Sequence, residues 1–492
     1  MLFTEPLFLF LFLPVLLAIY FCPWPLVLRP YSALRNWILL VASLIFYAKG
    51  GGLFTYLMVS SIAFNYVMAI TVDRALATGD AQSAKRRLAV AVGLNLVVLG
   101  IFKYANFFAA NLNVTLEALS LPRVSAPTIL LPIGISFFTF HAISYVVDVY
   151  RRDATAQKSP VHAALYLLLF PQLIAGPIVR YRDIADQLAR RVVTIDDFAY
   201  GVRRFTLGLS KKVLIANVVA GPADQIFTMP FEQLSTGHAW LGIVCYTVQI
   251  YFDFSGYSDM AIGLGRLFGF RFPENFKWPY IAESVTEFWR RWHISLSTWF
   301  RDYLYVPLGG NRVSPRRTYL NLVTVFFLCG LWHGASWNFV IWGLFHGAFL
   351  VLERRGLRNA LEKSALFIGP AGSVVRHTYL LVVVMVGWVF FRADTLAGAV
   401  AFLKALAGMS PAAPTTYSVQ WYLTSEVWLA LAAGAIGSTP WLPALAEKLT
   451  RDRPAVEWNL SLVSAGCLVA LLVASMMQMA ARAYSPFIYF RF

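Results

Sequence analysis

The chain has 492 residues, of which 59% are hydrophobic and 16% aromatic, while only 13% are Asp, Glu, Lys or Arg. Soluble globular domains carry about 25% charged residues, so this composition cannot cover a water-exposed surface of ordinary size. A mean hydropathy of +0.62, with long uninterrupted apolar runs, predicts a polytopic membrane protein. It excludes disordered chains, collagens and secreted disulfide scaffolds.

The formal charge of +16 arises from 41 Lys and Arg against 25 Asp and Glu. The basic residues cluster in short segments between apolar runs, where the positive-inside rule and anionic lipid headgroups account for them. We therefore expect membrane lipid as a partner and no nucleic acid.

The periodic and apolar segments predict an all-α fold with about ten transmembrane helices. The basic cluster Lys85–Arg87 is placed in the cytoplasm, which puts the amino terminus outside. Without an internal repeat or a soluble linker, residues 1–492 are expected to form one membrane domain. The predicted spans begin near Leu7, Trp37, Phe54, Leu88, Ile129, Ala239, Tyr319, Tyr379, Val427 and Leu460.

The apolar stretch from Val161 to Val179 is interrupted by Pro171, Gly176 and Pro177. Eight basic residues follow between Arg180 and Lys212. A full crossing would place this basic region outside, so we predict a re-entrant hairpin that keeps it in the cytoplasm. Irregular backbone at membrane depth survives only inside protein or beside a wet cavity, so the hairpin indicates an internal cavity.

The segment from Glu283 to Arg301 reads ESVTEFWRRWHISLSTWFR. It is too charged to span a membrane and too aromatic for a solvent loop. We predict a helix that lies at the interface or dips into the mouth of the cavity.

Ionisable side chains inside apolar segments are costly and indicate candidate functional residues. If a helix starts near Tyr319, His333 lies about 21 Å along it, near mid-bilayer depth. The flanking Gly330 and Gly334 are expected to leave room for a substrate chain. The alternative is a buried histidine bonded to a neighbouring helix.

His293 in RRWH is a second candidate, and its alternative is an ordinary interfacial polar residue. His141 could line the same cavity. Asp253 and Asp259 interrupt another apolar segment, but six helical steps put them about 120° out of phase. They are therefore expected to be structural, accepting hydrogen bonds from Arg290, Arg291 or the backbone.

The sequence contains no serine-hydrolase elbow, phosphate loop or zinc-protease motif, and we expect no metal and no bound cofactor. A buried neutral imidazole can take a proton from a hydroxyl while an acyl carbonyl is attacked. The residues thus favour acyl transfer.

Five sequence blocks follow one another from about Leu131 to His346. They are LPIGISFFTFHAISYVVDVYR, LIAGPIVRY, YFDFSGYSDMAIGLGRLFGFRFPENF, FWRRWHISLSTWFRDYLYVPLGG and LCGLWHGASWNFVIWGLFHG. In this order they resemble the membrane-bound O-acyltransferase family, most strongly its bacterial alginate O-acetylation branch. The ending SPFIYFRF is also similar to that branch.

The resemblance implies a ring of ten or more helices around a central funnel or tunnel, with His333 at the catalytic position. His293 falls where relatives carry a second polar residue, and His346 is expected to serve packing or hydrogen bonding. The resemblance also implies a multi-pass protein of the bacterial inner membrane that uses acetyl-CoA as donor. A separate periplasmic acetyltransferase, within a polysaccharide biosynthesis complex, would complete the transfer.

Other functions remain open from the sequence. Transfer of D-alanyl or other acyl groups to a cell-envelope polymer belongs to a related branch. A transporter or channel would also use a wet cavity with ionisable residues, although it predicts paired discontinuous helices in related halves. A purely structural subunit of an export complex would need no imidazole at mid-depth.

Overall fold

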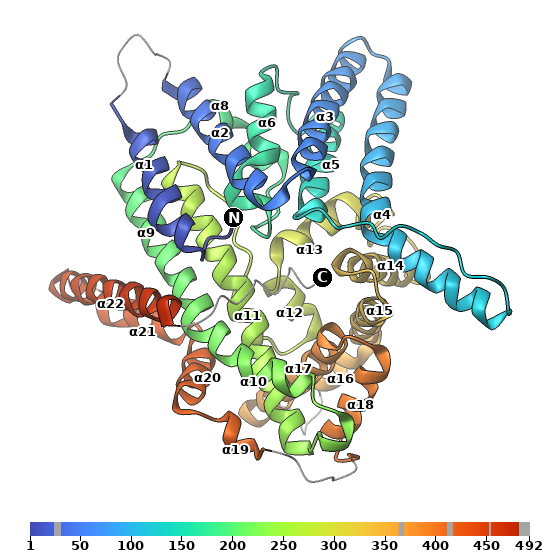
Figure 1. Ribbon diagram of the computed structural model, residues 1–492. Helices are drawn as coiled ribbons and strands as arrows, with labels where there is room; N and C mark the ends of the chain where they lie inside the picture. The colour runs from blue at the N-terminus through green and yellow to red at the C-terminus, as the bar shows by residue number, and fades with distance from the viewer. Residues whose placement is uncertain (24–30, 364–368, 411–416, 452–453, 482–492) are drawn as a thin grey trace. The chain divides into compact units, whose positions relative to one another are not determined.

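The computed structural model describes residues 1–23, 31–363, 369–410, 417–451 and 454–481, and all regular secondary structure in these residues is helical (Figure 1). The chain divides into two compact units. Unit 1 comprises Met1–Phe205 and Met260–Pro273, and unit 2 comprises Thr206–Asp259 and Glu274–Phe492. The similar ending SPFIYFRF lies outside the described residues.

Unit 1 is built from the amino-terminal helices. The chain passes from one unit to the other at three points: within α9 (Ile195–Ser210), within α11 (Thr236–Leu267) and between Pro273 and Glu274. The remaining elements of unit 1 are η1 (Phe8–Phe12), α1 (Leu13–Phe21), α2 (Tyr31–Gly51), α3 (Phe54–Ala77), α4 (Ala81–Ala118), α5 (Ile135–Arg151), α6 (Pro160–Leu168), α7 (Phe170–Leu173) and α8 (Tyr181–Ala189).

Helices α3, α4 and α5 lie side by side in unit 1 (Figure 1). The Asp80 side chain caps α4 by accepting a hydrogen bond from the Ser83 amide at 2.9 Å. Asn65 of α3 and Asn95 of α4 exchange amide hydrogen bonds of 3.2 and 2.8 Å. Polar side chains paired in this way hold apolar helices together where lipid provides no hydrophobic driving force.

The predicted interruption of the apolar stretch from Val161 to Val179 is present. Helix α6 ends at Leu168, and α7 adds a single turn before the chain passes Gly176 in irregular conformation. A Cβ on Gly176 would lie 2.6 Å from the Pro171 carbonyl oxygen, so only glycine fits this return. A nine-residue helix is about 14 Å long, too short to cross a bilayer of about 30 Å. The re-entrant path through the membrane stays a prediction.

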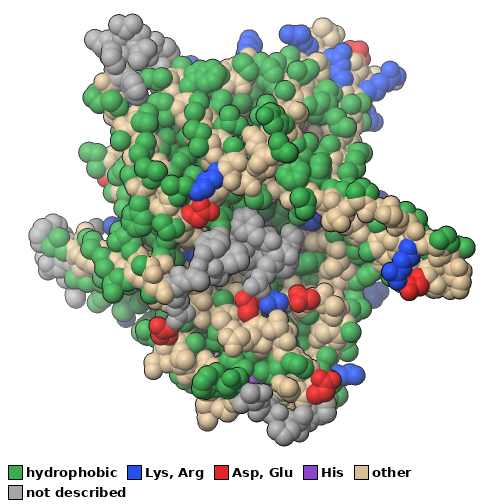
Figure 2. Space-filling view, viewed as in Figure 1, with side chains coloured by type: hydrophobic (Ala, Val, Ile, Leu, Met, Phe, Trp, Pro, Cys, Tyr) green, Lys and Arg blue, Asp and Glu red, His purple; other side chains and the backbone are tan. Residues whose placement is uncertain are grey.

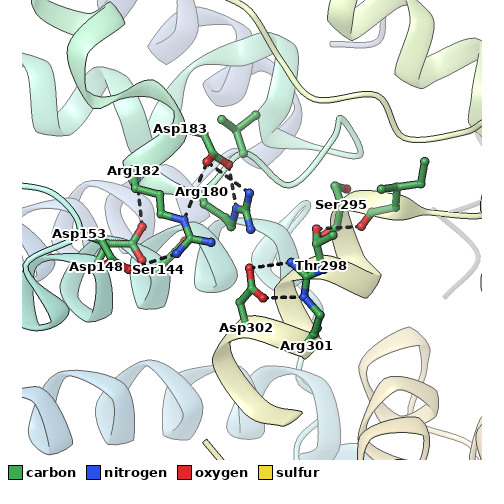
Figure 3. A network of polar contacts seen from close by, with 12 residues as sticks. Ser144, Asp148, Asp153, Arg180, Arg182, Asp183, Ser295, Thr298, Arg301 and Asp302 are labelled. Carbon is green, nitrogen blue, oxygen red and sulfur yellow. Dashed lines mark hydrogen bonds and ion pairs between the residues drawn. The ribbon is translucent and has the colours of Figure 1, made fainter. Parts of the chain in front are cut away.

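Two arginines that follow this break are paired with carboxylates within unit 1. Arg180 contacts Asp183 at 2.7 Å, and Arg182 contacts Asp153 at 3.1 Å (Figure 3). The amide of Arg182 also donates to the carboxylate of Asp148 at 3.0 Å. These arginines therefore stabilise the fold as well as adding to the basic count used to predict orientation.

Unit 2 holds the remaining described helices. They are η3 (Lys211–Ala216), α10 (Asn217–Phe227), η4 (Phe231–Gln233), η5 (Pro279–Ile281), α12 (Val285–Arg291), α13 (Ile294–Phe300), η6 (Arg301–Tyr305), α14 (Pro315–His333), α15 (Trp337–Leu352), η7 (Glu353–Leu357), α16 (Arg358–Lys363), α17 (Gly369–Arg392), α18 (Leu396–Leu406), α19 (Val419–Tyr422), α20 (Ser425–Gly437), α21 (Trp441–Thr450) and α22 (Pro454–Ala481).

In the described part of the chain, four helices are long and apolar enough to cross a membrane: Phe54–Ala77, Ala81–Ala118, Gly369–Arg392 and Leu460–Ala481. The pair α20 and α21, bent by 60°, could add a fifth. Hydrophobic side chains also predominate on the face drawn in Figure 2. A multi-pass membrane protein is thus supported, while the count of about ten spans stays a prediction.

Candidate functional site

His333 is the last residue of α14. Its side chain is buried, with 5% of the residue exposed. The imidazole lies edge-on to three aromatic rings, with centroid separations of 4.9 Å to Trp332, 5.0 Å to Trp342 and 5.1 Å to Phe391. These rings come from α14, α15 and α17, so three helices of unit 2 fix its position.

The stretch from Tyr319 to Glu353 is a helical hairpin rather than one long helix. Helix α14 ends at His333, and α15 begins at Trp337 after a three-residue connection. Because α14 starts at Pro315, His333 lies about 27 Å along it, farther than the sequence predicted.

The glycines beside His333 serve the hairpin and not a substrate chain. A Cβ on Gly330 would lie 2.2 Å from the carbonyl oxygen of Phe339 on α15. A Cβ on Gly334 would overlap the ring of Phe339, at 2.1 Å. The expectation that these glycines leave room for substrate is therefore wrong, because the neighbouring helix fills that space.

His293 lies at a sharp break between α12 and α13. The predicted interfacial segment forms two seven-residue helices instead of one, because His293 adopts a left-handed conformation with φ 44°. The residue is fully buried, and its ring meets Phe254 edge-on at 4.6 Å and Trp332 at 6.1 Å. The Trp332 ring thus contacts both candidate histidines.

One nitrogen of the His293 ring is held and the other is not. Nδ1 lies 3.1 Å from Oδ1 of Asn275. Nε2 is buried without a hydrogen-bond partner among the described residues. The ring is therefore oriented by protein while one polar atom remains available for chemistry.

His346, on α15, packs in the same aromatic cluster. Its ring centroid lies 5.1 Å from that of Trp342 and 5.2 Å from that of Trp289. A Cβ added to Gly387 would lie 2.6 Å from Nε2, so the ring packs directly against that glycine. Neither ring nitrogen has a hydrogen-bond partner among the described residues, so packing holds this side chain. The ring centroid of Trp342 lies 5.1 Å from that of His346 on the same helix. It also lies 5.0 Å from that of His333, because α15 runs antiparallel to α14.

Asp253 and Asp259 have the structural role expected of them, with different partners. Asp253 binds Lys212 at 2.6 Å, and both side chains are at most 5% exposed. Asp259 binds Lys211 at 2.7 Å. The sequence predicted Arg290, Arg291 or the backbone as partners, and Arg291 binds Glu287 one helical turn away.

Glu353 is a buried residue that sequence reasoning missed. Its carboxylate accepts hydrogen bonds from the amides of Val285 and Thr286, at 2.6 and 2.9 Å. It therefore caps the first turn of α12, where the helix dipole favours an anion. The end of α15 thereby fixes the helix that leads to His293. The only sequence signal was its place at the end of the apolar run that closes with Leu352.

Two further expectations concern His141 and metals. His141 is fully buried on α5 in unit 1, beside Tyr166 at 5.9 Å. Its part in a cavity stays a prediction. Among the described residues, no group of three or more His, Cys, Asp or Glu could hold a metal ion.

Comparison with known proteins gives a consistent pattern of similarity. Residues 138–367 match MBOAT, the membrane-bound O-acyltransferase family. The chain is 42% identical over 517 residues to the probable alginate O-acetylase AlgI of Azotobacter vinelandii, covering 100% of both chains. It is 48% identical over 396 residues to the Pseudomonas aeruginosa protein of the same name, covering 80% of this chain and 73% of that one. It is also 37% identical over 439 residues to a peptidoglycan O-acetyltransferase of Helicobacter pylori, covering 83% and 80%.

Proposed function

The chain belongs to the membrane-bound O-acyltransferase family, and we propose that it moves acetyl groups across the bacterial inner membrane for the O-acetylation of an exopolysaccharide such as alginate. Similarity over the full length to a probable alginate O-acetylase carries this proposal. The donor is acetyl-CoA from the cytoplasm. A separate periplasmic acetyltransferase in a polysaccharide biosynthesis complex receives the acetyl group and completes the transfer.

In this proposal His333 is the catalytic residue. Its position at the end of α14, with aromatic rings on three sides, supports a fixed imidazole in a site of low polarity. A neutral imidazole takes the proton from the acceptor hydroxyl as the oxygen attacks the acetyl carbonyl. His293, held by Asn275 and adjacent to Trp332, is the second catalytic residue.

We further propose the architecture that this chemistry requires. Ten or more helices form a ring around a funnel, and the segment around Pro171 dips in from the cytoplasmic side. The helix break at Leu169 and the irregular return through Gly176 support this. Such backbone at membrane depth must be enclosed by protein or line a wet cavity.

The test is the acetyl content of exopolysaccharide in cells that express each variant at matched membrane levels. His333→Ala is expected to lower acetylation by about 10²- to 10⁴-fold, the usual contribution of general-base catalysis. His346→Leu is the matched control, because it removes an imidazole without hydrogen bonds from the same cluster. It is expected to retain most activity.

Near-normal acetylation with His333→Ala would reject the catalytic assignment and favour a transporter. Loss of D-alanyl esters, with acetyl esters unchanged, would instead place the chain in the D-alanyl-transferring branch.

A further inference from the structure

Asn275 is buried in the loop between α11 and η5 and holds the turn that carries His293. Its backbone oxygen accepts a hydrogen bond from the amide of Ile294 at 3.0 Å. Its side-chain Oδ1 accepts from the amide and hydroxyl of Ser295, at 3.2 and 2.9 Å, and lies 3.1 Å from Nδ1 of His293. Its Nδ2 donates to the hydroxyl of Ser258 at 3.0 Å.

These contacts determine which way the Asn275 amide points. A backbone N–H can only donate, so the side-chain atom that faces the amide of Ser295 must be the oxygen. Nδ1 of His293 faces that same oxygen, which has no hydrogen to offer. Nδ1 must therefore carry the hydrogen of the neutral imidazole, and Nε2 must carry the lone pair.

The lone pair of Nε2 is buried without a hydrogen-bond partner among the described residues. Burying an unsatisfied acceptor destabilises a folded protein, so such atoms call for an explanation. The Trp332 ring lies 6.1 Å from the His293 ring and 4.9 Å from the His333 ring between centroids, so one aromatic side chain contacts both candidate histidines.

We propose that Asn275 is a positioning residue that holds His293 in the Nδ1–H tautomer, so that Nε2 presents a lone pair that accepts a hydrogen bond from another O–H or N–H group of the bound substrates. The inference rests on the proposed function of His293. His333 remains the base that takes the proton of the acceptor hydroxyl, so no bond is made or broken at Nε2 of His293. A neutral His293 in this tautomer cannot donate from Nε2 to the acetyl carbonyl.

The tautomer can be measured directly by solid-state NMR of the full chain in lipid bilayers, with ¹⁵N placed at either ring nitrogen of histidine. The His293 signal is identified by its loss in His293→Gln. An unprotonated ring nitrogen resonates far from a protonated one, so the two labels report the tautomer without reference to activity. The wild-type protein is expected to show hydrogen on Nδ1 of His293.

Three variants test the role of Asn275. Asn275→Leu keeps the approximate volume but removes the acceptor, and is expected to give a mixture of tautomers and about a 10-fold or greater loss of acetylation. Asn275→Asp keeps an oxygen toward His293 and is expected to keep hydrogen on Nδ1 and rescue most activity. Ser258→Ala removes only the partner of Nδ2 and should leave the tautomer unchanged.

Hydrogen on Nε2 in the wild type, or an unchanged tautomer in Asn275→Leu, would overturn the inference. If Asn275→Leu fails to fold, the His293 tautomer measured in the wild type and in Asn275→Asp still tests the inference. Normal acetylation in His293→Gln would reject the proposed catalytic role of His293, whereas the NMR result would still decide whether Asn275 sets the tautomer.

Discussion

Gly330 of α14 and Gly343 of α15 face each other across the helical hairpin whose first helix ends at His333. A Cβ on Gly343 would lie 2.3 Å from the carbonyl oxygen of Phe326 and 3.2 Å from the Cα of Gly330. The two backbones are therefore in direct contact. This close approach fixes the end of α14 relative to Trp342, one of the rings that surround the His333 imidazole.

Gly343→Ala is expected to destabilise the protein by about 1 to 3 kcal/mol, because the added methyl group overlaps backbone that cannot move aside. Thermal unfolding of the purified protein in detergent measures the loss. Gly93→Ala on α4 is the control, since its Cβ would meet nothing within 4 Å and Ala favours a helix. Equal melting temperatures for the two variants would contradict close packing at Gly343.

Lys212→Met is expected to lower stability by about 3 to 5 kcal/mol, because it leaves Asp253 charged and buried without Lys212. Thermal unfolding again measures this, and the double variant Lys212→Met/Asp253→Leu should recover most of the loss. Lys211→Met is the matched control. The Lys211 and Asp259 side chains are 30% and 9% exposed, so water reaches this pair more easily and its loss should cost less than that of the Lys212 pair. A larger effect for Lys211→Met than for Lys212→Met would reject the assigned burial of the two pairs.

The lowered pKa of the Glu283 carboxylate predicts that the stability of the protein depends on pH. The hydroxyl of Ser373, and then Arg376 at 2.6 Å, lower the pKa of Glu283 below its ordinary value of 4.5. Because the folded-state pKa is the lower one, this stabilisation is present above about pH 4.5 and is lost as the pH falls through the folded pKa. The side chain is 36% exposed, so screening limits the effect to about 1 kcal/mol or less.

Glu283→Gln should therefore lower the melting temperature at pH 7, and the difference from wild type should shrink toward acid pH. Glu117→Gln removes the partner of Arg123 in a pair whose side chains are 61% and 67% exposed, and should change little at any pH. A constant difference between Glu283→Gln and wild type across the pH range would reject the role of ionisation.

The re-entrant hairpin predicts that the segment after it faces the cytoplasm. Ile195 is 88% exposed at the start of α9 and is a suitable site for a cysteine, whereas Asp197 is paired with Arg266. In intact cells, an impermeant thiol reagent should miss Ile195→Cys and should label Ser125→Cys, which the predicted topology places outside. The background for both variants must lack the native cysteines Cys22, Cys245, Cys329 and Cys467. Labelling of Ile195→Cys from the periplasm would contradict the hairpin.

The sequence by itself determined the class of protein, the helix break near Pro171 and the family. Membrane class follows from composition, and the break near Pro171 follows from residues that lack a backbone donor or a side chain. Both are local properties, so no tertiary information was needed. His333 and His293 were identified because ordered blocks of sequence resemble a family, and their catalytic roles stay predictions.

Only the tertiary structure decided which groups contact one another. Several cations near the apolar segments have the right charge for Asp253, and the structure pairs it with Lys212, 41 residues away in the sequence. The space beside Gly330 was filled by Phe339, because a three-residue connection turns α15 back along α14. Asn275 and Glu353 act on the turn of His293 and on α12 through contacts distant in sequence. Residue type determines what a side chain can bind, but the packing of helix faces determines what lies within reach of it.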